Sequence, residues 1–174
     1  MKRYIKKLLR EGLLSEDDDI KQKLMSLLKS GDIDNIELAY ALGKGQKINV
    51  DELVKSIYGE FLLNKAKGKT IKDKLINLTN LDVLGLHNNE LKSLPDWIGK
   101  LKNLRRLYLS GNRLKSLPES IGNLTNLKKL DLHNNELKSL PESIENLTNL
   151  RGLNLYDNPI SDEEKERIKK LLPN

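Results

Sequence analysis

The chain has 174 residues, of which 37% are hydrophobic, 32% charged and 4% aromatic, a balance that fits one soluble folded body with an aliphatic core and excludes a disordered chain. It contains no cysteine, so disulfide bonds, thiolate metal ligands and cysteine nucleophiles are excluded. The formal net charge is +6, but 31 basic residues are interspersed with 25 acidic ones, so the charge is weak evidence for a nucleic-acid partner.

The chain begins MKRYIKKLLREGLL, in which basic residues interrupt the apolar ones. No apolar run is long enough for a secretion signal or for a membrane span of roughly 18 residues, so we expect a cytoplasmic protein. An amphipathic start with Ile5, Leu8 and Leu9 between lysines would also suit an anionic membrane surface. We favour a capping helix with a solvated basic face.

Residues 1–69 show helical patterns and no repeat. We expect three helices, which run in chain order from Ser15 to Gly31, from Asp34 to Gly43, and onward from Asn49, with Glu52 completing a capping box. Apolar residues at helical spacing predict two buried stripes: Ile20, Leu24, Leu27 and Leu28 in the first helix, and Leu53, Val54, Ile57 and Phe61 in the third.

From residue 81 onward the sequence repeats with a period of 23 residues, in units that begin at Leu81, Leu104, Leu127 and Leu150. Counted from these leucines, every unit has leucine at its first, fourth and sixth places. Every unit also has asparagine at its ninth place: Asn89, Asn112, Asn135 and Asn158. The first three units continue with a Leu-Pro pair, an isoleucine, a leucine and a closing asparagine (Asn103, Asn126, Asn149).

The positions of these residues predict the structure of one unit. Leucines at the fourth and sixth places, between mostly polar neighbours, indicate a short strand with one buried face. The ninth-place asparagine stands where the chain must turn, and its amide suits backbone groups that the turn leaves unpaired. Proline then ends the strand segment and begins the return leg. Because one unit buries too little apolar surface to fold alone, the units must stack and share a parallel sheet.

The pattern L-x-x-L-x-L-x-x-N-x-L resembles the leucine-rich repeat family, and the following L-P-x-x-I-x-x-L-x-N resembles its 23-residue class, found in Ras-suppressor-like and bacterial intracellular repeat proteins. The resemblance covers residues 71–174 and implies an α/β solenoid with a short parallel sheet on its concave side. It also implies a non-enzymatic protein–protein interaction module that binds its partner on that concave face. The ubiquitin-ligase effectors that carry such repeats need a catalytic cysteine, which this chain lacks.

The repeat domain is expected to span residues 70–174, with a degenerate unit at 70–80 and units from residues 81, 104, 127 and 150, of which the last departs from the pattern as a terminal unit. Its predicted C-terminal cap is a helix at about 162–172, with a capping box of Ser161 and Glu164 and an apolar stripe of Ile168, Leu171 and Leu172. Residues 1–69 are predicted to cap the other end, since a stack of strands leaves an apolar layer and a strand edge to cover.

The third, fifth and seventh places are expected to point outward on the concave side, in three columns that vary from unit to unit. The candidate partner-binding residues in these columns are Arg106, Tyr108, Ser110, Lys129, Asp131, His133, Asn154 and Tyr156, flanked by Arg105, Lys128 and Arg151. The basic residues favour an acidic or mixed-charge protein segment as the partner. The ninth-place asparagines are predicted to carry stability and not binding.

His87 and His133 lie two units apart, about 10 Å, and no third ligand accompanies them, so we expect no metal site and no cofactor. For Trp97, packing against the helical cap is favoured over an exposed partner anchor.

Two further functions stay open. One is a protein that binds an anionic surface, either nucleic acid or a membrane. We disfavour both of these partners relative to a protein. The other is a secreted bacterial effector or surface adhesin. No phosphate-binding loop, catalytic triad or paired-carboxylate motif occurs, so we expect no enzymatic activity, and we expect a monomer.

Overall fold

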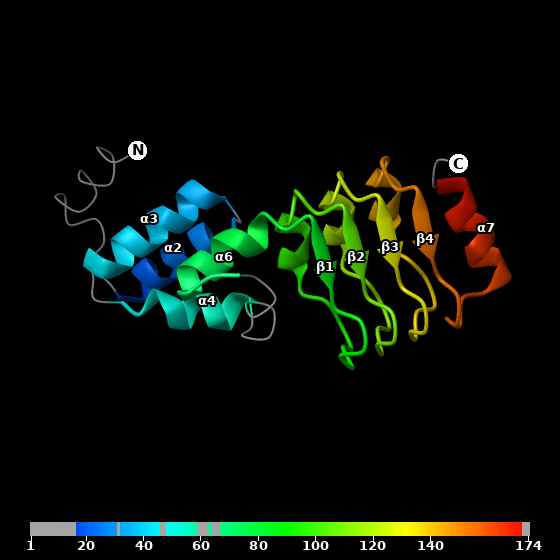
Figure 1. Cartoon of the computed structure of the whole chain (residues 1–174), viewed down its shortest axis with the longest axis horizontal. Coiled ribbons are helices and arrows are strands. Elements are labelled where there is room, and N and C mark those ends of the chain that lie inside the picture. The colour runs from blue at the N-terminus through cyan, green and yellow to red at the C-terminus, as the bar shows by residue number, and fades with distance from the viewer. Residues whose placement is uncertain (1–16, 31, 46–47, 59–62, 64–66, 172–174) are drawn as a thin grey trace. The chain divides into compact units, whose positions relative to one another are not determined.

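The computed structural model describes residues 17–30, 32–45, 48–58, 63 and 67–171 (Figure 1). The chain divides into two compact parts, an N-terminal part of residues 1–60 and a C-terminal part of residues 61–174. The described elements of the N-terminal part are helices, and the C-terminal part contains all four strands of the sheet.

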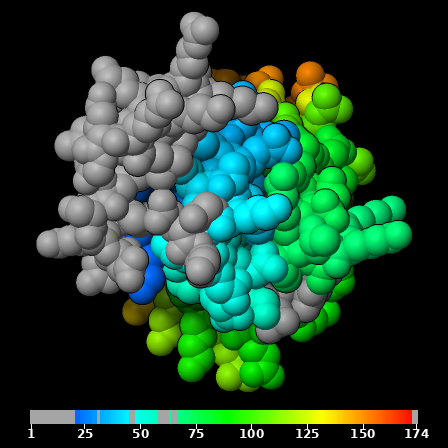
Figure 2. Space-filling model, turned by 90° about the vertical axis from the view of Figure 1, so that its left-hand side faces the viewer, coloured from blue at the N-terminus to red at the C-terminus, as the bar shows by residue number. Residues whose placement is uncertain are grey.

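The N-terminal part contains the helices α2 (Asp17–Lys29), α3 (Ile33–Gly45) and α4 (Val50–Tyr58). Their inward side chains form an aliphatic core: Leu24, Leu28, Ile36, Ala39, Val50 and Val54. The helices α3 and α4 lie side by side (Figure 2). The Tyr40 hydroxyl of α3 donates a hydrogen bond to the Asp51 Oδ1 of α4 at 2.7 Å.

The predicted helix bounds need two corrections. Helix α3 begins at Ile33 rather than at Asp34, because Asp32 caps it by accepting a hydrogen bond from the Asn35 backbone N–H at 3.0 Å. It also continues past Gly43 to Gly45. The Asn49 cap forms as predicted, although its hydrogen bond from the Glu52 N–H is long, at 3.4 Å.

Three predicted features of these helices lie outside the described residues: the cap at Ser15, the end at Gly31 and the stripe residue Phe61. The capping role of residues 1–69 stays a prediction.

The C-terminal part contains helix α6 (Ile71–Thr79), in the predicted degenerate unit. Thr70 caps it and forms a full capping box with Asp73, whose carboxyl pKa is held below its usual value by hydrogen bonds from Thr70. At its end, the Leu81 N–H donates to the Leu78 carbonyl, as the Leu104 N–H donates to the Leu101 carbonyl one unit later. The degenerate unit thus ends like the others but replaces their shorter helical turn with an α-helix.

Four short parallel strands follow in the order β1 (Val83–Gly85), β2 (Arg106–Tyr108), β3 (Lys129–Asp131) and β4 (Gly152–Asn154). Each residue pairs with its equivalent in the next unit, so that Leu84, Leu107, Leu130 and Leu153 stand in one row. In Figure 1 the strands stand side by side with the return legs on one face of the sheet. Paired residues in neighbouring strands are therefore 23 residues apart, which is the period of the sequence.

The return legs carry 3₁₀-helices η1 (Asp96–Lys100), η2 (Glu119–Asn123) and η3 (Glu142–Asn146), each directly after a proline. These helices stack so closely that a Cβ atom at Gly99 would collide with the Ser120 carbonyl oxygen, and one at Gly122 with that of Ser143. Glycine therefore stands at this place in both 3₁₀-helical return legs that another 3₁₀-helical return leg follows. The third return leg has Glu145 there, and no fourth one stacks on it among the described residues.

The ninth-place asparagines join consecutive units. The Asn112 amide nitrogen donates to the Leu86 carbonyl of the preceding unit at 2.8 Å, and its oxygen accepts from the Asn89 and Leu91 N–H groups. Asn135 and Asn158 donate in the same way to the Leu109 and Leu132 carbonyls, and each accepts from one N–H group, that of Leu114 and that of Leu137. Asn89, in the first unit, is only half-buried, and its amide nitrogen donates to the nearby His87 carbonyl.

The residue before each of these asparagines has a left-handed backbone: Asn88, Gly111, Asn134 and Asp157, with φ between 53° and 65°. Sequence reasoning passed over this eighth place. The signal was present, because glycine, asparagine and aspartate are the residue types that adopt this conformation most readily.

Helix α7 (Asp162–Leu171) closes the C-terminal end. Ser161 caps it by accepting from the Glu164 N–H. The Glu164 carboxylate accepts instead from the Leu140 N–H at 3.0 Å and from Arg167, so the second half of the predicted capping box does not form. Of the predicted stripe, Ile168 is buried, Leu171 is half-buried and Leu172 lies outside the described residues.

Candidate binding face of the sheet

The exposed face of the sheet consists of the side chains on either side of the buried leucine row. In β1 to β3 the middle residue is buried and the residue before it is exposed. The strand register places the third-place residues Val83, Arg106, Lys129 and Gly152 in one column, and the fifth-place residues Gly85, Tyr108, Asp131 and Asn154 in another. The candidate residues on β2 to β4 thus lie side by side.

Basic side chains gather at the beginning of the strands. Those of Arg105, Arg106, Lys128, Lys129 and Arg151 are all exposed. One acidic residue, which sequence reasoning missed, stands among them at the second place of the first unit. Asp82 forms ion pairs with Arg105 (Oδ1 to Nε, 3.4 Å) and with Arg106 (Oδ2 to an Nη atom, 3.5 Å). The second place is acidic in the first unit and basic in the other three, and this contrast was the signal in the sequence.

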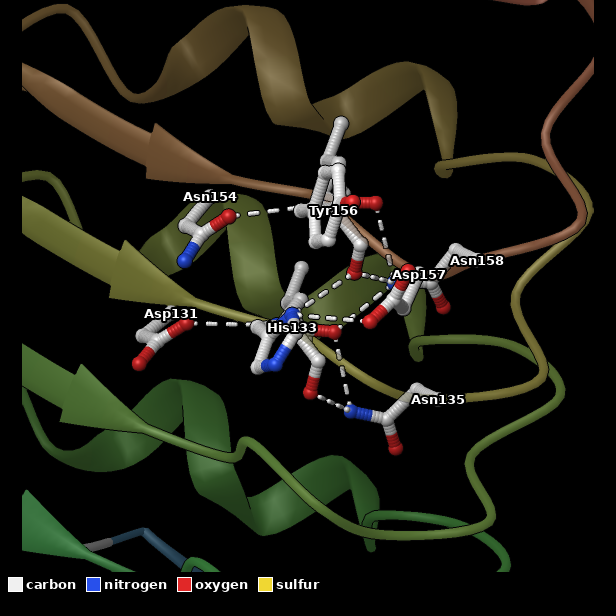
Figure 3. Close-up of polar contacts among 9 residues, drawn as sticks. Asp131, His133, Asn135, Asn154, Tyr156, Asp157 and Asn158 are labelled. Carbon is white, nitrogen blue, oxygen red and sulfur yellow. Dashed lines mark hydrogen bonds and ion pairs between the residues drawn. The ribbon is translucent and has the colours of Figure 1, made fainter.

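A different chemistry occupies the other end of β3 and β4 (Figure 3). The rings of His133 and Tyr156 stack with centroids 5.6 Å apart. The His133 Nδ1 lies 3.2 Å from the Tyr156 carbonyl oxygen and 3.9 Å from the Asp157 Oδ2. Asp131 accepts a hydrogen bond from the His133 backbone N–H. We call these four residues the ring corner.

The side chain of Tyr156 is 72% exposed. A ring that is both exposed and held flat against a neighbour offers apolar area at little cost in side-chain entropy, which suits a partner contact. Ser110, the seventh-place residue of the second unit, is half-buried, and its carbonyl accepts from the Asn88 N–H.

Trp97 is 7% exposed, in the first turn of η1. The interpretation of this residue as an exposed partner anchor is therefore wrong. The described part of the chain contains no group of three or more histidine or acidic side chains that could hold a metal ion. Within that same part, no helix is long and apolar enough to cross a membrane.

The chain is similar to several known repeat proteins. A family model for a leucine-rich repeat region matches residues 61–172. A solved leucine-rich-repeat protein of Leptospira interrogans is 44% identical over 58% of this chain, with a TM-score of 0.52. An internalin of Listeria monocytogenes is 28% identical over 56% of the chain (TM-score 0.49), and a plant peptide hormone receptor in complex with its peptide is 35% identical over 50% (TM-score 0.45).

These matches span only 27%, 28% and 15% of the respective solved chains. A search of curated protein sequences found no match. Repeat regions of this kind generally serve as interaction modules rather than as enzymes. The family model covers well over half of the residues and every strand of the sheet, so the chain belongs to the leucine-rich repeat family.

Proposed function

We propose that this protein is a non-enzymatic binding module that holds another protein on the exposed face of its sheet. The observation that carries this proposal is the contrast between the two faces. Leucine occupies the centre of every strand and is buried in β1 to β3 and half-buried in β4, whereas the outward places carry basic, acidic and aromatic residues that differ between units.

Exposed apolar side chains support the same face. Three large hydrophobic residues are exposed in the described part of the chain, and two of them, Val83 (39%) and Tyr156 (72%), belong to the outward columns of the sheet. Aromatic and arginine side chains on such a face are typical of partner anchors. The basic side chains favour a partner segment that is acidic or of mixed charge.

The test is capture of partners from the native host by the full chain, followed by measurement of the affinity of the captured protein. Arg106→Glu combined with Lys129→Glu should weaken binding about tenfold or more, chiefly through slower association. Lys100→Glu combined with Lys170→Glu changes the net charge equally at exposed places away from the sheet face, and should leave the affinity within about threefold. If both double variants lost affinity equally, or if neither lost affinity, the partner would not bind on this face of the sheet.

The basic side chains also support one alternative, a binder of anionic surfaces. For such a protein, the affinity for DNA, RNA or anionic vesicles should fall steeply with salt. Binding to these probes that is weak and equal in the two charge-reversed variants would exclude this alternative.

A further inference from the structure

The ion pairs of Asp82 divide the basic residues of the binding face into two groups. The Asp82 carboxylate lies between Arg105 and Arg106 of the next unit and compensates part of their charge. In the second and third units the place of Asp82 is taken by Arg105 and Lys128. As a result, no acidic residue stands in the equivalent position before the basic residues of the third and fourth units.

Those remaining basic residues are Lys128, Lys129 and Arg151. They are exposed and lie at the beginning of β3 and β4, where the Arg151 N–H donates to the Lys128 carbonyl, and no ion pair is formed by them within the described ranges. Like charges gathered without a counter-charge repel one another and attract an anion from outside. The third and fourth units therefore present the uncompensated positive charge of the binding face.

The ring corner lies at the opposite end of the same two strands and has the opposite character. Asp131 and Asp157 contribute two carboxylates there, and in the part of the chain that the structure describes neither pairs with a lysine or an arginine. The exposed ring of Tyr156 stands beside them. A guanidinium group can stack on such a ring and pair with a carboxylate at the same time.

We infer that the third and fourth units bind an extended protein segment that carries adjacent carboxylates at one end and an arginine at the other. This inference rests on the proposed function and assigns the chemistry of the partner on that face. The carboxylates lie against Lys128 and Lys129, and the arginine lies against the ring corner. His133 of the ring corner stands four to five residues after Lys128 and Lys129 in the chain, with Asp131 between them. An extended chain rises about 3.3 Å per residue, so the basic pair and the His133 ring are separated by about 13–17 Å.

Synthetic peptides provide the probe. The full chain is titrated, at low salt, with labelled peptides in which Glu-Glu and Arg are separated by zero to seven Gly/Ser residues, in both orders. An extended peptide bridges about 13–17 Å with three or four spacer residues, so these should bind about tenfold more tightly than the peptide without a spacer, in one of the two orders. Affinity that does not depend on spacer length in either order would overturn the inference.

Matched variants test the division made by Asp82. Lys128→Gln with Lys129→Gln should weaken the best peptide about tenfold, whereas Arg105→Gln with Arg106→Gln should weaken it less than about threefold. Tyr156→Ala should abolish the advantage of the arginine over an alanine at that position. Equal effects of the two double variants would overturn the inference and leave the proposed function standing, whereas a native partner insensitive to every face variant would overturn the proposed function itself.

Discussion

The side-chain amide of Asn112 donates a hydrogen bond to the backbone carbonyl of Leu86, 26 residues earlier, at 2.8 Å. Asn112 is 7% exposed and also accepts from two backbone N–H groups of the preceding turn. One side chain therefore satisfies backbone groups of two units, and its loss leaves several of them unpaired in a buried place.

Asn112→Ala should lower the free energy of unfolding by about 1–3 kcal/mol, the usual cost of leaving buried polar groups unpaired. Asn89→Ala is the matched control, because Asn89 has the same place in the first unit but donates only locally to the His87 carbonyl. The control should cost clearly less. Urea unfolding of both variants measures the two losses of stability. Equal midpoints would mean that the hydrogen bonds between units contribute nothing to the stability of the protein.

Gly122→Ala should destabilise the protein by about 1–3 kcal/mol, since its Cβ would collide with the Ser143 carbonyl oxygen of the next return leg and force the legs apart. Glu145→Ala changes the equivalent exposed residue of the third unit. It should stay within about 0.5 kcal/mol of the wild type. A Gly122→Ala variant as stable as the wild type would show that the return legs can separate freely.

The left-handed eighth place offers a third prediction. Asn134 has a φ of 54°, a conformation that costs an ordinary L-residue about 1–2 kcal/mol. Asn134→Val should therefore lower the free energy of unfolding by that amount, seen as a lower denaturant midpoint with an unchanged slope, while Asn134→Gly should be nearly neutral. If valine and glycine gave the same midpoint, the backbone conformation would not be the cause.

The fourth prediction concerns pH and helix α7. Hydrogen bonds from Arg167, and a further one from the Leu140 N–H, hold the pKa of the Glu164 carboxyl below its ordinary value of 4.5. A carboxyl with a lowered pKa in the folded state stabilises the protein above its unfolded pKa, and this contribution is lost as the pH falls through the lowered value.

Glu164→Gln should accordingly cost about 1–2 kcal/mol at pH 7, and the gap between variant and wild type should narrow below pH 4.5. Unfolding curves at pH 7 and pH 3 measure both gaps. Glu163→Gln, at an exposed neighbouring place, is the control. A gap for Glu164→Gln that is constant with pH would assign the loss to geometry rather than charge.

The sequence by itself determined the stack, its register and the division into buried and outward places. This was possible because each unit packs against a near copy of itself, so the residue opposite Leu107 is Leu130, one period further on. Periodicity along the chain is then the same thing as adjacency in space, and no long-range partner has to be guessed.

The tertiary structure alone decided what happens where that symmetry ends or where side chains meet across units. Asn89 and Asn112 occupy the same place in the pattern, yet among the described residues Asn112 binds a backbone carbonyl of the preceding unit and Asn89 binds one in its own turn. Asp82 compensates Arg105 and Arg106 and leaves Lys128 and Lys129 without a counter-charge, which depends on the spatial reach of one carboxylate. Such differences arise from which neighbour is present at each end of the stack, and a repeating pattern carries no information about its own ends.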